Sequence, residues 1–154
     1  LFRSLDMDED DWRGVMAVNV DGVFRTAQAA ARAMPEGGSI VATASILAFG
    51  TGRGLAAYAA SKAAVVQLVR ALALEWGPKG VRVNALAPGY VPTEMNRDFL
   101  EGPEGARIAA GLPLGRLGRP DDLDGALLLL LSDAGRWMTG VTIPVDGGHL
   151  VAPL

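Results

Sequence analysis

Apolar residues along this chain fall into two kinds of segment. Long segments rich in Ala, Val and Leu end at Gly and Pro, which is typical of helices; they cover about residues 9–34, 55–76 and 121–132. Short apolar runs without polar alternation separate them, at residues 39–45, 81–87 and 141–145. Such runs are typical of parallel strands that are covered on both faces.

Particular residues mark where the predicted helices begin and end. Asp8 is a suitable N-cap for the first helix, and the acidic residues 9–11 complement its positive end. Pro35 and the glycines at 37–38 end that helix. Pro120 opens the third helix, because proline is favoured at the first helical position.

The order helix–strand–helix–strand–helix–strand predicts an α/β fold. It is the arrangement of the C-terminal half of a doubly wound (Rossmann-type) parallel sheet. The last strand contains Pro144, which lacks a backbone N–H and therefore suits the edge of a sheet.

Residues 90–118 are predicted to be irregular, because Gly and Pro interrupt their apolar side chains. A stretch of this length is long for a simple connection. Since the apolar side chains would close over a bound molecule, we expect a substrate lid. An ordinary surface loop is the alternative.

Composition excludes several classes of function. The 154 residues fit a single domain, and the net charge of −3 gives no electrostatic reason to expect nucleic acid or an anionic membrane as a partner. There are no cysteines and one histidine, His149, so no metal site is expected. The longest apolar run, Ala126 to Leu131, is too short to span a bilayer. We therefore expect a cytoplasmic protein that does not enter a membrane.

Four polar residues are the candidates for chemistry. Tyr58 and Lys62 are four apart in a predicted helix and share one face. Ser45 ends the first predicted strand, and Asn19 lies in the first helix. Phenol, ammonium, hydroxyl and amide together suit proton transfer to a carbonyl oxygen that gains or loses a hydride.

The Tyr58–Lys62 pair needs a special environment to be functional. A tyrosine phenol is protonated at neutral pH. An exposed pair four residues apart contributes only about 0.2–0.5 kcal/mol, too little to make a phenol act as a base. Proton transfer by Tyr58 therefore requires a pocket that excludes water. On a solvent-exposed surface the spacing of Tyr58 and Lys62 indicates no function.

Five motifs occur in a fixed order along the chain. They are Gly38-Ser-Ile-Val-Ala-Thr-Ala-Ser45, Tyr58-Ala-Ala-Ser-Lys62, Val81-Arg-Val-Asn-Ala-Leu-Ala-Pro-Gly89, Tyr90-Val-Pro-Thr93 and Pro144-Val-Asp-Gly-Gly148. This series resembles the short-chain dehydrogenase/reductase family of the classical type. The resemblance extends from Asp11 to Gly148 and covers the C-terminal part of the family's pattern.

The resemblance implies a role for each polar candidate. Tyr58 would be the general acid/base, and Lys62 would hold the nicotinamide ribose and make the phenol more acidic. Ser45 would bind and orient the substrate oxygen. Asn19 would anchor a water molecule in the proton relay. The substrate would be a small alcohol or carbonyl compound.

The resemblance also implies a cofactor, NAD or NADP, and the residues that meet it. Pro88, Gly89 and the backbone of Val91 would form the wall facing the nicotinamide. The hydroxyl of Thr93 would reach the cofactor amide or phosphate.

One departure from the family pattern concerns the start of the chain. The glycine-rich TGxxxGxG turn and the NNAG-like strand of the family are not in this sequence, so we expect the half that grips adenosine and pyrophosphate to be absent. Gly52 to Ala57 fits G-x-G-x-x-A. We interpret it as a loop over the active site, because six residues separate Gly52 from Ser45.

Two functions from different classes remain. One is an NAD(P)-dependent alcohol dehydrogenase or ketone reductase, represented by a partial chain. The other is a non-catalytic remnant that only oligomerises or binds a partner. A homo-oligomer, a tetramer by the family resemblance, is expected through the helices at about 9–34 and 55–76, because residues 63–74 are apolar on almost every face.

Overall fold

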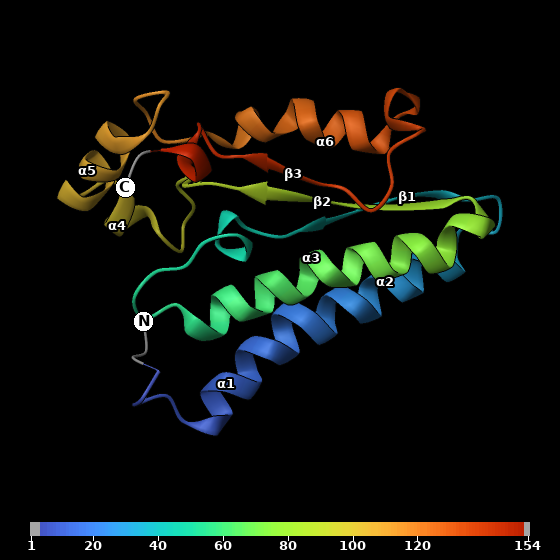
Figure 1. Cartoon of the computed structure of the whole chain (residues 1–154), viewed down its shortest axis with the longest axis horizontal. Helices are drawn as coiled ribbons and strands as arrows, with labels where there is room; N and C mark the ends of the chain where they lie inside the picture. Colours follow the sequence, from blue (N-terminus) through green and yellow to red (C-terminus); the bar gives the residue numbers. More distant parts are fainter. Residues whose placement is uncertain (1–3, 153–154) are drawn as a thin grey trace.

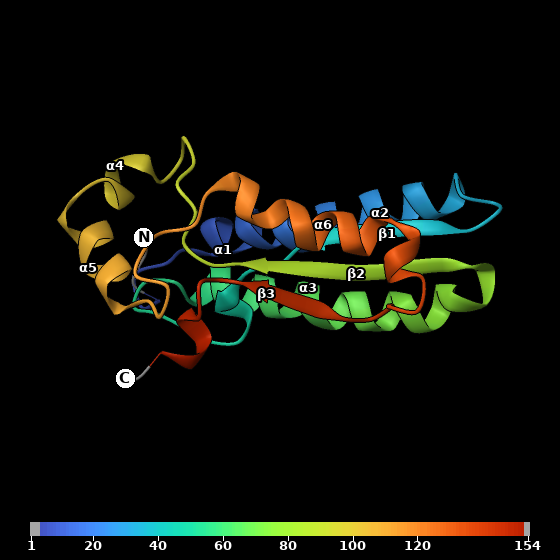
Figure 2. The ribbon, with the colours of Figure 1, turned by 90° about the horizontal axis from the view of Figure 1, so that it is seen from above.

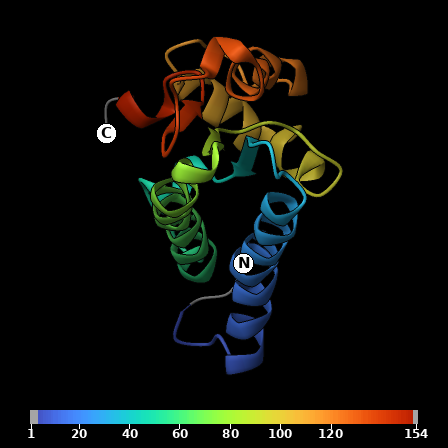
Figure 3. The same ribbon diagram turned by 90° about the vertical axis from the view of Figure 1, so that its right-hand side faces the viewer.

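The computed structural model describes residues 4–152 and contains a parallel sheet between two layers of helices (Figure 1). The strands are β1 (Gly38–Thr43), β2 (Val81–Pro88) and β3 (Thr142–Val145), in the order β1-β2-β3. One face of the sheet carries helix α6, and the other carries α2 and α3 (Figure 3). The predicted α/β class with a parallel sheet is confirmed.

The pairing of the strands shows which of them lie at the edges of the sheet. β1 pairs with β2 from Gly38↔Val81 onward, and β2 pairs with β3 from Ala85↔Thr142 onward. β3 has β2 as its neighbour, so Pro144 lies in an edge strand, as predicted. In the part of the chain that the structure describes, the outer edge of β1 has no partner strand either.

The first predicted helix is continuous but not uniform. It consists of α1 (Glu9–Met16), a π turn (Ala17–Asp21) and α2 (Gly22–Arg32). Asp8 is its N-cap, and its carboxylate accepts a 2.7 Å hydrogen bond from the N–H of Asp11. The predicted helix over about 9–34 is present, but it ends at Arg32, and the π turn was not foreseen.

Helix α3 (Ala56–Trp76) is the central element of the core. Its buried residues Val65 and Val69 pack against Val81, Val83 and Ala85 of β2. The opposite side of α3 is exposed along one stripe. The stripe consists of Ala56, Ala60, Ala63, Gln67, Arg70 and Leu74. The outward face of α3 is therefore mostly apolar, with three alanines and one leucine beside two polar residues.

One helix among the described residues is long and apolar enough to cross a membrane by length and composition. It is α3 together with the 3-10 turn that follows it, Ala56–Lys79. The sequence prediction considered only the uninterrupted run Ala126 to Leu131 and so overlooked this segment. Because seven residues of α3 are buried, and five of them belong to the core cluster with β2, we interpret it as the core helix of a globular domain.

Residues 90–118 are more regular than predicted. They contain two short helices, α4 (Arg97–Leu100) and α5 (Pro103–Gly111). The two helices touch closely, since a Cβ on Gly105 would lie 1.7 Å from the carbonyl oxygen of Leu100. A 3-10 turn at Pro120–Leu123 then leads into α6 (Asp124–Leu131), which matches the third predicted helix.

Candidate active site

The candidate residues gather at the carboxyl ends of the strands. Ser45 follows the end of β1, Tyr58 lies in the first turn of α3, and Gly89 follows β2. Helices α4 and α5 lie beyond the same end of the sheet (Figure 2). Ligands of open α/β sheets bind outside this end of the strands, so the placement agrees with a ligand site.

Tyr58 and Lys62 lie together on α3, as their spacing predicts. The Lys62 ammonium nitrogen is 5.6 Å from the centroid of the Tyr58 ring and over its face. The same nitrogen donates a 3.0 Å hydrogen bond to the carbonyl oxygen of Thr43, the last residue of β1. The lysine is therefore held between the helix and the end of the strand.

The two side chains differ in how dry their surroundings are. Lys62 is half-buried, and this burial lowers its pKa from the ordinary lysine value because the charged form loses solvation. The Tyr58 ring is at the surface, with 36% of the residue exposed. Lys62 is thus partly withdrawn from solvent, and the expected dry pocket is not closed over Tyr58.

Ser45 is placed by a short turn. It is buried and forms the N-cap of the 3-10 turn Ile46–Ala48, where its Oγ accepts a 3.1 Å hydrogen bond from the N–H of Leu47. This bond uses the oxygen as an acceptor, so the hydroxyl proton is available for donation. The turn packs against α3.

Asn19 reaches α3 through a residue that the sequence analysis did not single out. Its side-chain amide donates a 3.0 Å hydrogen bond to Oγ of Ser61, and the Ser61 hydroxyl donates a 2.7 Å bond to the carbonyl oxygen of Tyr58. Asn19 sits in the middle of the π turn. No local sequence signal marks Ser61, because its partner is 42 residues away.

The predicted cofactor wall is a loop tied by one side chain. Asn96 accepts a 2.6 Å bond from the N–H of Thr93 and donates a 3.1 Å bond to the carbonyl oxygen of Val91. Sequence reasoning missed Asn96, although an Asn three residues after Thr93 is typical of a side-chain-capped turn. Both Val91 and Thr93 are thereby fixed in one turn.

Gly89 is required by close packing between the ends of β2 and β3. Its N–H donates a 2.9 Å bond to the carbonyl oxygen of Val145. A Cβ at this position would lie 2.7 Å from the Cα of Asp146. The position therefore has to be glycine for packing, whatever faces it from the other side.

The two halves of the predicted site open on different hollows. A hollow of about 490 Å³ between α2 and β1 is lined by residues that include Asn19 and Lys62. A second hollow, of about 190 Å³, is lined by residues that include Gly89 and Val91. Neither Tyr58 nor Ser45 lines either hollow. Among the described residues, Asn19, Tyr58 and Lys62 are thus connected through α3, whereas Ser45 and the 88–93 loop lie at the same end of the sheet with no hydrogen bond to them.

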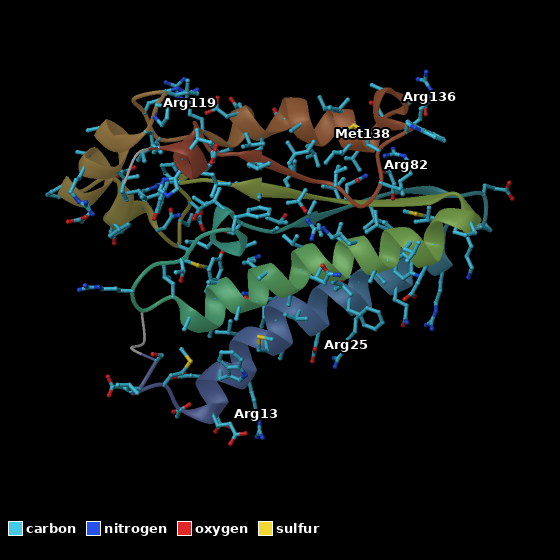
Figure 4. The ribbon with its side chains drawn as sticks, in the orientation of Figure 1. Arg13, Arg25, Arg82, Arg119, Arg136 and Met138 are labelled. Atoms are coloured by element: carbon cyan, nitrogen blue, oxygen red, sulfur yellow. The ribbon has the colours of Figure 1, made fainter. Side chains whose placement is uncertain are left out.

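Several arginines lie away from this site (Figure 4). Arg13 and Arg25 pair with acidic residues one helical turn earlier, at 2.6 Å and 3.8 Å. Arg82 donates a 3.1 Å bond to the carbonyl oxygen of Met138 at the amino ends of the strands.

Among residues 4–152, no three or more His, Asp or Glu side chains gather as they would around a metal ion.

Comparison with known proteins identifies the family. A family model described as enoyl-(acyl carrier protein) reductase matches residues 2–149. The chain is 46% identical, over 98% of its length, to a galactitol 2-dehydrogenase (L-tagatose-forming) of Cereibacter sphaeroides. It is 40% identical, over 96% of its length, to an L-rhamnose 1-dehydrogenase (NAD(P)+) of Azotobacter vinelandii.

This chain belongs to the short-chain dehydrogenase/reductase family. Solved structures of such dehydrogenases have the same fold: a gluconate 5-dehydrogenase of Burkholderia cenocepacia, in complex with NADP and tartrate, superposes with a TM-score of 0.94 at 37% identity over 99% of this chain.

The match covers only part of the length of these dehydrogenases. The chain spans 61% of the galactitol dehydrogenase, 59% of the rhamnose dehydrogenase and 61% of the gluconate dehydrogenase chain. This agrees with the predicted C-terminal part of a doubly wound sheet.

Proposed function

We propose that this chain is the catalytic portion of an NAD(P)-dependent dehydrogenase that interconverts an alcohol and a ketone or aldehyde. The observation that carries the proposal is the Tyr58–Lys62 pair. Its ammonium lies over the phenol ring, 5.6 Å from the centroid, and is bound to the carbonyl oxygen of Thr43 at the carboxyl end of β1. The same chemistry is named for relatives such as the galactitol 2-dehydrogenase.

Tyr58 acts as the general acid/base. Its phenolate accepts the proton of the alcohol during oxidation, and its phenol returns one to the carbonyl oxygen during reduction. Lys62 places its ammonium over the phenol ring, 5.6 Å from the centroid. The hydroxyl of Ser45 donates to the substrate oxygen and orients it, and Asn19 holds the proton path behind Lys62.

The residues at this end of the sheet fit the nicotinamide end of a dinucleotide. When bound, NAD or NADP accepts or supplies the hydride. Lys62 would hold the ribose, Pro88, Gly89 and Val91 would face the ring, and Thr93 would bind the amide or phosphate. The sequence has no TGxxxGxG turn to receive the pyrophosphate.

The substrate we propose is a small polyhydroxylated compound. Galactitol, L-rhamnose and gluconate appear in the names of relatives at 46%, 40% and 37% identity. Residues 90–118, with α4 and α5, form the lid over it. The enzyme would be a cytoplasmic homo-oligomer, associated through α1–α2 and α3.

A non-catalytic remnant that only oligomerises or binds a partner is the second candidate. One observation favours it for this chain by itself. The outer edge of β1 has no partner strand among the described residues, and an unpaired strand edge pairs readily with other chains.

Cofactor titration distinguishes the two candidates. We expect the chain alone to bind NADH and NADPH more weakly than micromolar, and a longer product of the same reading frame, with a TGxxxGxG turn, to bind tightly and oxidise galactitol. A stop codon directly upstream would favour the remnant. Micromolar binding by the chain alone would reveal a binding element within these residues, and the Gly52–Ala57 turn would be examined first.

A further inference from the structure

Ser61 is a fully buried hydroxyl between the two residues of the acid/base pair. It follows Tyr58 by three positions and precedes Lys62 by one, and none of its surface is exposed. Polar side chains are seldom fully buried, and those that are buried are held by hydrogen bonds. The proposed mechanism gives Ser61 no task, so its burial needs another reason.

Ser61 makes two hydrogen bonds of different kinds. Its hydroxyl donates to the carbonyl oxygen of Tyr58 at 2.7 Å, a bond within one helix that serines often form. Its oxygen also accepts a bond from the side-chain amide of Asn19 at 3.0 Å. The second bond joins two helices and places the serine at the centre of a chain from Asn19 to Tyr58.

Asn19 lies in the one segment of its helix that departs from α geometry. The π turn covers Ala17–Asp21, and π turns are rare and often found at functional sites. This turn packs directly against α3. The amide of Asn19 is thus the link that fixes the turn on the helix of the acid/base pair.

Asn19 and Lys62 also share a hollow. Both line the space of about 490 Å³ between α2 and β1. The Lys62 ammonium is fixed there by the carbonyl oxygen of Thr43. Asn19 is fixed by Ser61, so the serine sets where the amide lies relative to the ammonium.

We propose that Ser61 is a positioning residue of the active site, whose hydroxyl holds Asn19 and the π turn against α3. It acts through Asn19 and touches no reacting atom. The inference rests on the proposed function, because it assigns Ser61 to the same site.

Hydrogen–deuterium exchange of the full chain tests the contact itself. Ser61→Ala removes both bonds, Ser61→Thr keeps the hydroxyl, and Ser39→Ala is a matched control that loses a 2.8 Å hydroxyl bond to the carbonyl oxygen of Leu130. We expect Ser61→Ala to speed exchange in residues 17–21 about threefold to tenfold. Ser61→Thr should restore slow exchange, and Ser39→Ala should not affect these residues. Unchanged exchange in Ser61→Ala, or an equal effect of Ser39→Ala, would overturn the proposal.

Kinetics test the effect of Ser61 on turnover. The measurement uses a longer protein translated from the same reading frame that oxidises galactitol. Ser61→Ala should lower kcat about 10- to 100-fold with little change in the KM for galactitol. Combining it with Asn19→Ala should add nothing, because both variants break the same link. Additive losses would overturn the proposal. The exchange measurement needs no turnover, so an inactive parent would contradict the proposed function and leave the role of Ser61 to be decided by exchange.

Discussion

The ammonium nitrogen of Lys62 lies 5.6 Å from the centroid of the Tyr58 ring, and a carbonyl oxygen of the neighbouring strand holds it there. A cation over an aromatic face is attracted by about 0.5–1 kcal/mol at a partly exposed site. That attraction alone is small against the barrier changes of catalysis. The contact therefore matters more for position, since the bond to the carbonyl oxygen of Thr43 fixes the ammonium beside the ring.

The first prediction concerns the proton donor. Tyr58→Phe keeps the ring and removes only the hydroxyl, so turnover of galactitol in the complete enzyme should fall about 10²- to 10⁴-fold. Dinucleotide affinity should change little. Steady-state kinetics and cofactor titration check both parts, and a variant that keeps more than about a tenth of kcat would exclude Tyr58 as the acid/base.

The second prediction follows from the burial of Lys62. Burial lowers its pKa below the ordinary 10.5, so the unfolded chain holds this proton at pH values where the folded chain has lost it. In the window below 10.5, the free energy of unfolding therefore rises with pH. Lys62→Met should remove that rise, as measured by urea unfolding at a series of pH values.

The other lysine provides the control for this measurement. Lys79 is exposed in the turn after α3. Lys79→Met should keep the slope of the parent chain. If the free energy of unfolding changed with pH equally in the parent and in Lys62→Met, the folded chain would not lower the pKa of Lys62.

Part of this architecture is readable from the sequence because the signals are local. Asp8 caps α1 as its position predicts, and Pro144 lies in the edge strand, where a missing N–H does no harm. The π turn is different. Its residues, Ala17–Asp21, are ordinary helix residues, and the turn is stabilised by tertiary contacts with α3.

The candidate site was predicted in the same uneven way. The spacing of Tyr58 and Lys62 brings them together on one helix, since both belong to one turn. Ser61 and Asn96 were missed because their bonds depend on geometry that no periodicity shows. Helix α4 was missed because four residues are too few for a helical pattern to stand out, and α5 because Gly and Pro interrupt its apolar residues.

The third prediction concerns the link between the lid and α6. Arg116 donates two bonds, of 2.6 and 2.9 Å, to the carboxylate of Asp122, and this holds the pKa of Asp122 at about 2 against an ordinary 3.8. Its contribution to stability is therefore present above pH 3.8 and is lost as the pH falls toward 2. Asp122→Asn should unfold at lower urea than the parent at neutral pH.

The difference between parent and Asp122→Asn should shrink as the pH approaches 2. The neighbouring Asp121 is also exposed, and Asp121→Asn is the matched control. A difference that stays constant across this pH range would mean that the charge of Asp122 does not stabilise the fold.

The fourth prediction concerns the tight approach of β2 and β3. Gly89→Ala would place a Cβ 2.7 Å from the Cα of Asp146, so backbone has to move. We expect a loss of about 1–3 kcal/mol in the free energy of unfolding. Gly14→Ala, inside α1 with nothing within 4 Å, should instead raise it by about 0.5–1 kcal/mol. Urea titrations of both variants give the signs, and an unchanged stability of Gly89→Ala would contradict the close approach of the two strand ends.

The fifth prediction concerns self-association. The exposed stripe of α3 is small and mostly uncharged, so two copies can approach closely along it. Ala63→Arg in this stripe should lower the mass measured by light scattering, whereas Ala106→Arg, exposed on α5, should not. A parent chain that is a stable monomer at micromolar concentration would exclude the proposed oligomer.

The π turn has a consequence for the evolution of this chain. Each residue of an α-helix advances it by about 100°, and a π turn accommodates one more residue than an α turn. Deleting one residue from 17–21 would therefore convert the π turn into an ordinary α turn and leave α1 and α2 facing nearly the same sides as before. The loss would be local: the bulge that carries Asn19 would disappear, and with it the placement of the Asn19 amide against Ser61. A helix of normal geometry here would keep the packing of its flanks and lose the link to α3.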